Sequence, residues 1–270
     1  MIYYKSPKED WTLLLEYLPQ SIRNNLTKIL LPARIVAADN LRNGSLGHPH
    51  FDMKSFIASK SIFVHIPKAA GRSIRKQIYN GVTCSHTTLY WYSLALRHYS
   101  TEDYFLYTIV RNPWDRLHSA YYFLKKGGAH VGDETLFKKH LSKYKTFEEF
   151  VLDMPQSGIP PIVHMKPMHY FLELRNGKTL VNYVGYFEDL EMSYRYILSK
   201  IPSVESAINK NTVLCHENSN TVNKNCYVYD YTDEMIDVVS TIYKRDIALF
   251  GYTFEGFSRA RAIFEPCCVS

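Results

Sequence analysis

A short run in the first third of the chain brings together residue types suited to holding an anion. Lys68 precedes Gly71, and Arg72 and Ser73 follow that glycine directly. Backbone N–H groups at such a turn, and the positive end of a following helix, attract a phosphate or a sulfate. The lysine and arginine add fixed positive charge at the same place. The spacing therefore predicts an anion site at residues 67–73.

A second candidate anion site follows the next strongly apolar strand. Arg111 ends that strand, and Ser119 lies eight residues later on the expected helix. Ser119 falls off the apolar stripe of that helix, which consists of Trp114, Leu117, Tyr121 and Leu124. Its hydroxyl can join Arg111 in holding an anion, or it can face water. The residues alone leave both interpretations open.

Both candidate sites lie where a strand pattern changes to a helix pattern. The first strand begins at Ser61 and breaks at Pro67, and a helix is expected over about residues 73–80. The second strand covers residues 104–110, after which Asn112 is the expected N-cap and Pro113 the first helical residue.

The rest of the chain continues this alternation of strands and helices. We expect helices at 9–30, 89–98, 135–153, 189–200 and 232–250, a strand at 181–187, a loop at 155–161 and a polar segment at 209–225. The pattern predicts an α/β fold of three layers, P-loop-like, with a central, mostly parallel sheet flanked by helices. In such folds ligands bind beyond the carboxyl ends of the strands, where both candidate sites lie.

Composition narrows the class of protein. The chain has 270 residues, of which 46% are hydrophobic, so one domain with a sizeable core is expected at residues 59–256. We assign residues 1–58 to a helical arm and linker and 257–270 to a tail. The net charge of +6 favours anionic ligands, but no dense basic stripe indicates nucleic acid. Five cysteines without a CxxC pair, and a charged N-terminus, predict a cytoplasmic protein without a membrane span.

The first site differs from the phosphate loop of nucleoside triphosphatases, GxxxxGK[ST]. Ile66 stands where the first glycine would be, and Arg72 occupies the lysine position. The second strand ends in Arg111, whereas a magnesium-dependent enzyme usually places an aspartate there. We therefore expect a metal-free nucleotide with two separate anionic groups, and no metal site.

Two longer motifs resemble those of a known family. Phe63-Val64-His65-Ile66-Pro67-Lys68-Ala69-Ala70-Gly71-Arg72-Ser73 resembles the 5′-phosphosulfate loop of the sulfotransferases, in the branch of Golgi carbohydrate sulfotransferases and their bacterial relatives. The run Val110-Arg111-Asn112-Pro113-Trp114-Asp115-Arg116-Leu117-His118-Ser119-Ala120-Tyr121 resembles the 3′-phosphate motif of the same family. Weaker similarity covers residues 184–190 and 246–252, so the resemblance extends over roughly residues 60–255.

The resemblance implies transfer of a sulfuryl group from 3′-phosphoadenosine 5′-phosphosulfate (PAPS), as co-substrate, to an acceptor. By matching position, Lys68 would stabilise the departing phosphate, while Arg111 and Ser119 would hold the 3′-phosphate. The implied nucleotide-binding residues are Pro67, Lys68, Ala69, Ala70, Gly71, Arg72, Ser73, Arg111, Ser119 and Tyr227. Ala69 and Arg72 depart from the residues that relatives often carry there.

Transfer to a hydroxyl also needs a base, and a histidine is the usual one near neutral pH. We choose His86, because it lies in a polar loop between the two anion sites where relatives carry a histidine. The alternative is an incidental loop histidine. His65 is expected to pack on its strand with a satisfied nitrogen. The acceptor-site candidates are His164, His169 and His216, and Glu188 is expected to support the fold.

We thus expect a PAPS-dependent sulfotransferase whose acceptor is a hydroxyl, on a carbohydrate, with Lys68 and His86 as catalytic residues. One alternative is a P-loop kinase or nucleotidase. Another is a non-catalytic protein that binds nucleotides or glycans with this fold. The sequence does not predict the oligomeric state.

Overall fold

The structure is a computed structural model, and it describes residues 38–39, 53–79, 86–96, 103–173, 181–201 and 226–258. The helix expected at 9–30, the polar segment at 209–225 and residues 259–270 of the expected tail lie outside these ranges.

A parallel sheet of three strands forms the centre of the described chain. The strands lie in the order β1 (Ser61–Val64), β2 (Phe105–Val110) and β3 (Tyr183–Tyr186). Ser61 pairs with Phe105, and Tyr107 pairs with Tyr183. All four residues of β1 are buried, as expected for the continuous apolar runs of parallel sheets. The predicted α/β class with a parallel sheet is confirmed.

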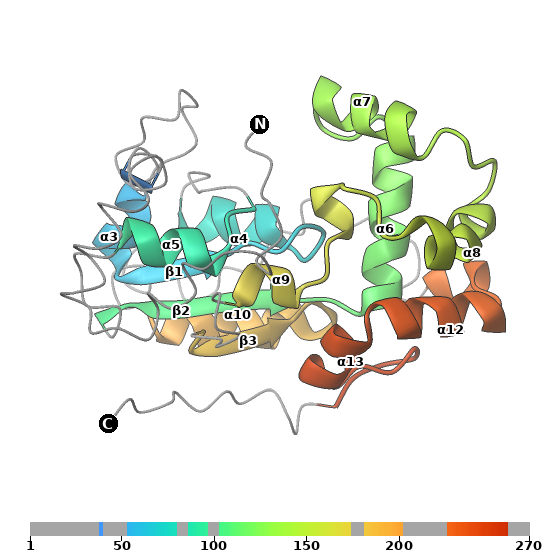
Figure 1. Ribbon diagram of the computed structural model, residues 1–270. Coiled ribbons are helices and arrows are strands. Elements are labelled where there is room, and N and C mark those ends of the chain that lie inside the picture. Colours follow the sequence, from blue (N-terminus) through green and yellow to red (C-terminus); the bar gives the residue numbers. More distant parts are fainter. Residues whose placement is uncertain are drawn as a thin grey trace, which may run out of the picture.

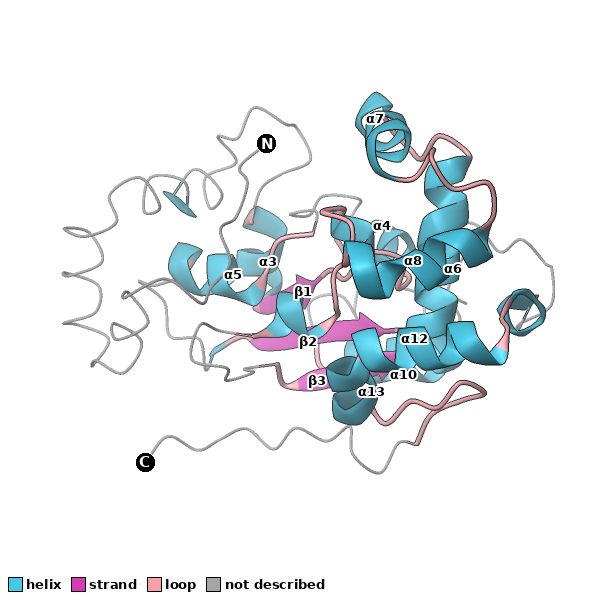
Figure 2. Cartoon of the chain, turned by 45° about the vertical axis from the view of Figure 1, so that its right-hand side comes forward, coloured by secondary structure: helices cyan, strands magenta, loops and turns pink. Residues whose placement is uncertain are grey.

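Helices flank the sheet and extend it at one end (Figures 1 and 2). Three of them, α3 (Lys54–Ser59), α4 (Gly71–Ile78) and α5 (Leu89–Ala95), lie above the sheet in Figure 1, and α10 (Leu190–Ser199) packs against β3. Beyond the carboxyl end of β2 lie α6 (Pro113–Lys125), α7 (Val131–His140), α8 (Phe147–Ser157), α12 (Asp233–Ile242) and α13 (Lys244–Phe250). The short elements are η4 (Val163–Met165), α9 (His169–Leu172), η5 (Phe187–Asp189) and η6 (Cys226–Asp230).

Asn112 joins three parts of the fold at the carboxyl end of the sheet. As predicted, it caps α6, and its side-chain oxygen accepts a hydrogen bond from the N–H of Trp114 at 3.1 Å. Its side-chain amide donates to the carbonyls of Thr253 at 2.9 Å and Phe254 at 3.1 Å. Its backbone N–H donates to Glu188 at 2.6 Å. Asn112 therefore fixes the start of α6 to the end of β3 and to the C-terminal loop.

The single helix predicted at 135–153 is wrong, because the structure has α7 and α8 there, separated by a turn. Thr146 begins the second helix by accepting a hydrogen bond from the N–H of Glu149 at 3.1 Å, and the Glu149 carboxylate accepts from Lys145 N–H at 2.7 Å. These reciprocal bonds are a local helix-start signal that the apolar periodicity concealed. The loop predicted from residue 155 is also wrong at its start, because Pro155 lies within α8.

The predicted helix at 232–250 is likewise divided into α12 and α13. Thr232 caps α12 as the polar start predicted, accepting from Met235 N–H at 3.3 Å. The break falls at Tyr243, which is buried and donates its hydroxyl to the carbonyl of Met165 at 2.7 Å. A contact with a loop distant in sequence therefore marks the break, and helical periodicity carries no sign of it.

Replacing Asn112 tests its joining role. Asn112→Ala removes a helix cap and leaves the carbonyls of Thr253 and Phe254 without their donor, so the free energy of unfolding should fall by about 2–4 kcal/mol. Thr146→Ala is the matched control, since it removes a cap alone and should cost about 1 kcal/mol. Urea unfolding of both variants provides the comparison. Equal losses would contradict the role of Asn112 beyond capping.

Candidate active site

The loop between β1 and α4 has the backbone shape of an anion cradle. Lys68 and Ala70 both have left-handed backbone angles, with φ of 68° and 57°. The carbonyl of Ala70 accepts the N–H of Ser73 at 3.1 Å, which begins α4. In the described part of the chain, no hydrogen bond uses the N–H groups of residues 69–72. These donors remain available to an anion at the start of the helix.

Gly71 is required at this turn because of its neighbour His65. A Cβ atom at position 71 would overlap the imidazole ring of His65. The ring therefore packs directly on the cradle backbone, as expected for a strand residue. Nδ1 of His65 is enclosed without a hydrogen-bond partner in the described ranges, so a satisfied ring nitrogen stays a prediction for Nε2.

Three cations converge around the cradle. Burial, followed by the positive charges of Arg111 and Arg72, lowers the pKa of Lys68 to about 8. The Lys68 ammonium lies 3.9 Å from the ring centroid of Phe123. The side chain of Arg72 is exposed. Because these like charges repel one another, an anion bound among them would remove an unfavourable interaction.

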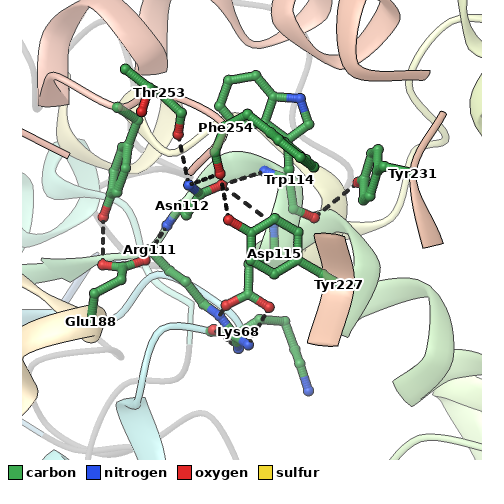
Figure 3. A network of polar contacts seen from close by, with 11 residues as sticks. Lys68, Arg111, Asn112, Trp114, Asp115, Glu188, Tyr227, Tyr231, Thr253 and Phe254 are labelled. Carbon is green, nitrogen blue, oxygen red and sulfur yellow. Dashed lines mark hydrogen bonds and ion pairs between the residues drawn. The ribbon is translucent and has the colours of Figure 1, made fainter. Parts of the chain in front are cut away.

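Arg111 connects the second anion site to the first (Figure 3). Its guanidinium forms two hydrogen bonds with the Asp115 carboxylate, at 2.7 and 2.8 Å, and donates to the carbonyl of Lys68 at 3.0 Å. Three of its five N–H groups are thus used, which leaves two for a ligand. Ser119 is half-buried on α6, about 9 Å along the helix axis from its first residue, Pro113. No hydrogen bond between the two side chains is seen in the described structure.

The hydroxyl of Tyr227 donates to the carbonyl of Phe254, and only 4% of the residue is exposed (Figure 3). Its ring lies edge-on to Phe254, with centroids 5.5 Å apart. The hydroxyl therefore serves the C-terminal loop, and a contact of Tyr227 with a nucleotide stays a prediction. Glu188 has the expected supporting role, because it accepts from the N–H of Asn112 and from Tyr252 at 3.0 Å. It acts at the start of α6 rather than at the helix that follows it.

Three imidazole rings lie together beside Lys68. The ring of His86 is 4.6 Å from His65 and 5.4 Å from His164, measured between centroids. Burial is the main cause that lowers the pKa of His86 to about 3 and that of His164 to about 4. The rings are therefore uncharged at neutral pH. An uncharged imidazole has a lone pair that can accept a proton, but a pKa of about 3 makes the ring of His86 a weak base in the unliganded protein.

The structure adds two residues that the motifs did not assign. His164 was only one of several acceptor-site candidates, and Phe123 was not singled out. Phe123 lies on the face of α6 toward the cradle loop, and its ring is 5.3 Å from His164. No local pattern signals this arrangement, because the segment that carries His164 follows α8, far along the chain from the cradle.

Two further observations concern the class of site. In the ranges that the structure describes, no three His, Cys, Asp or Glu residues are grouped so that they could hold a metal ion. Within the same ranges, no helix is both long and apolar enough to cross a membrane.

Comparison with known proteins agrees with the geometry. The model of the sulfotransferase family matches residues 58–253, which is well over half of the chain. No curated protein and no solved structure gives a significant match. The chain therefore belongs to the sulfotransferase family and is a sulfotransferase enzyme. Members of this family generally take the sulfuryl group from PAPS.

The lowered pKa of Lys68 predicts a pH-dependent affinity for 3′-phosphoadenosine 5′-phosphate (PAP), the nucleotide product. Lys68 is mostly charged at pH 7 and neutral above its pKa of about 8, so binding should weaken as the pH rises. Loss of one charged hydrogen bond corresponds to roughly a tenfold or larger change in affinity between pH 7 and pH 9.5. Calorimetric titrations with PAP across this pH range measure the affinity at each pH. In Lys68→Met the dependence should disappear, and a variant that kept it would assign the titration to another group.

Proposed function

We propose that this enzyme transfers the sulfuryl group of PAPS to an acceptor hydroxyl on a carbohydrate, without a metal ion. The observation that carries the proposal is the bond between the two anion sites. Arg111 donates to the carbonyl of Lys68, so the expected 3′-phosphate site and the cradle are held at a fixed separation. A nucleotide with phosphate groups on both its 3′ and 5′ positions fits two linked sites better than a triphosphate chain does.

The residues of the cradle supply the electrostatic part of the reaction. The N–H groups of residues 69–72, which have no partner in the described ranges, and the side chains of Arg72 and Ser73 hold the 5′ group. When bound, PAPS supplies an activated sulfuryl group. Lys68 places its positive charge where negative charge develops on the departing phosphate. Because its pKa is about 8, Lys68 is mostly protonated at neutral pH and can do so.

Arg111 and Ser119 would hold the 3′-phosphate. Arg111 keeps two N–H groups free, and its guanidinium is fixed by Asp115 and by contact with the Phe187 ring at 4.2 Å. A fixed guanidinium loses little freedom on binding a phosphate. Ser119 would add a hydroxyl donor from the same helix.

His86 would remove the proton of the acceptor hydroxyl. Its main support is position, since it lies in the imidazole group next to Lys68 and is uncharged. A hydrogen bond with the backbone of His65 and, to a smaller extent, the carboxylate of Asp133 act in the opposite direction to burial and raise the pKa of His86. Both would help to stabilise the proton once it has moved to the ring. The proposal of a carbohydrate acceptor rests on the resemblance of the motifs. The proposed cytoplasmic location rests on the sequence alone.

A P-loop kinase or nucleotidase is the main rival, and the surroundings of Asp115 count against it. Close to the end of β2, both oxygens of Asp115 are bonded to Arg111, and Glu188 accepts from the N–H of Asn112 and from Tyr252. They are therefore already engaged, whereas an enzyme of that class needs a carboxylate for magnesium.

Transfer of labelled sulfate from PAPS tests the function. The purified protein would be incubated with ³⁵S-labelled PAPS and neutral or acidic oligosaccharides, with 4-nitrophenol as a simple phenol. Labelled oligosaccharide is the expected product, and labelled phenol alone would overturn the carbohydrate assignment. PAP binding without any transfer would favour a non-catalytic binding protein.

His86→Ala tests the base. The variant should bind PAP with nearly unchanged affinity, while turnover should fall by about 10²–10⁴-fold. His140→Ala, at the end of α7, is the control histidine, and we expect full turnover from it. Full activity of His86→Ala would remove His86 from this role.

Arg111→Ala tests the 3′-phosphate site. Loss of charged hydrogen bonds should lower the affinity for PAP by roughly 10²-fold. The affinity for adenosine 5′-monophosphate, which lacks the 3′-phosphate, should fall by less than about threefold. Arg195→Ala is the matched control, because Arg195 also pairs with a carboxylate four residues away, at an exposed position of α10. Calorimetry gives both affinities. Equal losses for the two nucleotides would contradict the assignment.

A further inference from the structure

We propose that His164 is a positioning residue that holds the ring of His86 in place for proton removal. This inference rests on the proposed function, because it concerns the base of that reaction. His164 is not part of either nucleotide motif, and it belongs to η4, which follows α8.

The first observation is a continuous series of ring contacts. The Lys68 ammonium lies over the ring of Phe123, whose centroid is 5.3 Å from that of His164. The ring of His164 then meets His86 at an interplanar angle of 73°. Among the rings of the described ranges, only His164 contacts both Phe123 and His86. It therefore sets the spacing between the cation for the leaving group and the base for the acceptor.

The second observation is how firmly the backbone of His164 is held. Arg116 is almost wholly buried, with 1% of its surface exposed, and it donates to the carbonyls of His164 at 3.1 Å and of Lys166. Tyr243 donates to the carbonyl of Met165 between them. Burying a guanidinium costs several kcal/mol unless it is well bonded, and here its partners are backbone carbonyls of one short turn. The turn is thereby held rigid.

A buried carboxylate holds the other end of the same segment. Asp246 is fully buried and accepts the backbone N–H groups of Met168 at 2.6 Å and His169 at 2.9 Å. The ring of His169 adds a third bond to it at 2.6 Å. The segment on both sides of Lys166 is therefore bound to α6 and α13. These bonds give the backbone of His164 a fixed place.

The third observation concerns Nδ1 of His164. In the described ranges this atom is enclosed without a hydrogen-bond partner, and 8% of the residue is exposed. The charged groups facing the two rings are Lys68, Arg75, Arg116 and Asp133. Because the two imidazoles repel each other when both are charged, the pair takes up one proton at a time.

In the proposed step, the acceptor O–H bond breaks and its proton moves to His86, while the acceptor oxygen bonds to sulfur. The bond from sulfur to the 5′-phosphate oxygen breaks, and its electron pair stays on that oxygen beside Lys68. His164 takes no part in these bonds. Together with the backbone of His65, to which His86 is hydrogen-bonded, it holds the ring of His86 in place.

The test uses three variants of the full chain. His164→Ala removes the ring, His164→Phe keeps a ring without nitrogens, and His164→Asn removes the ring but keeps a polar side chain in case the alanine variant does not fold. Misplacement of a base corresponds to a loss of about 10- to 100-fold in kcat for the ring-deleted variants. The affinity for PAP should stay within about twofold. His164→Phe should recover most of the loss, and His140→Ala again serves as the control.

A double variant separates positioning from an independent role. If His164 acts through His86, the double replacement His86→Ala with His164→Ala should be no slower than His86→Ala alone. Losses that multiply would overturn the inference, and so would normal kcat in the ring-deleted variants. If His164→Phe were as inactive as His164→Ala while His86→Ala stayed active, His164 itself would be the base.

A second readout does not depend on turnover. In protein labelled with ¹⁵N-histidine and bound to PAP, the imidazole signals of His86 should shift or broaden in His164→Ala and stay near the wild-type positions in His164→Phe. Unchanged His86 signals in His164→Ala would overturn the inference. If the wild-type protein transferred no sulfate, the proposed function would fail, and this comparison would still decide whether His164 fixes the His86 ring.

Discussion

The burial of Lys68 close to two arginines, at the carboxyl end of the sheet, is the constraint on which the rest of the site depends. Lys68, Arg72 and Arg111 are held together although no ion pair of Lys68 is seen in the described ranges, and the pKa of Lys68 falls to about 8 as a result of burial and these charges. A folded protein keeps such an arrangement only where the surrounding structure enforces it. The enforcing contacts are the Arg111 bonds to Asp115 and to the Lys68 carbonyl.

Two sets of buried polar contacts carry this constraint into the fold. Asn112 and Glu188 fasten the ends of β2 and β3 to the C-terminal loop, so the strand ends cannot separate. Arg116 and Asp246 fasten the segment from residue 164 to residue 169 against α6 and α13. The first set holds the start of α6 next to Arg111, and the second holds the segment that carries His164.

The sequence predicted the parts of this structure that depend on local signals. The strands, the α6 start at Asn112 and Pro113, and the positions of Lys68 and Arg111 at strand ends follow from apolar runs and from capping residues. The break at Tyr243 was missed because its hydroxyl bonds to a distant loop, and a tertiary contact of this kind leaves no periodic trace. His164 was not distinguished from other histidines for the same reason, since its partners come from different elements.

We propose that the linked anion sites select a nucleotide with separate 3′ and 5′ phosphates and need no metal. Calorimetric titration of the wild-type protein with PAP in the presence of a chelator, beside a titration with magnesium-ATP, provides the test. We expect micromolar or tighter binding of PAP, about 8 kcal/mol or more, and at least about tenfold weaker binding of magnesium-ATP, a difference of about 1.4 kcal/mol. Tight binding of magnesium-ATP together with weak binding of PAP would contradict it.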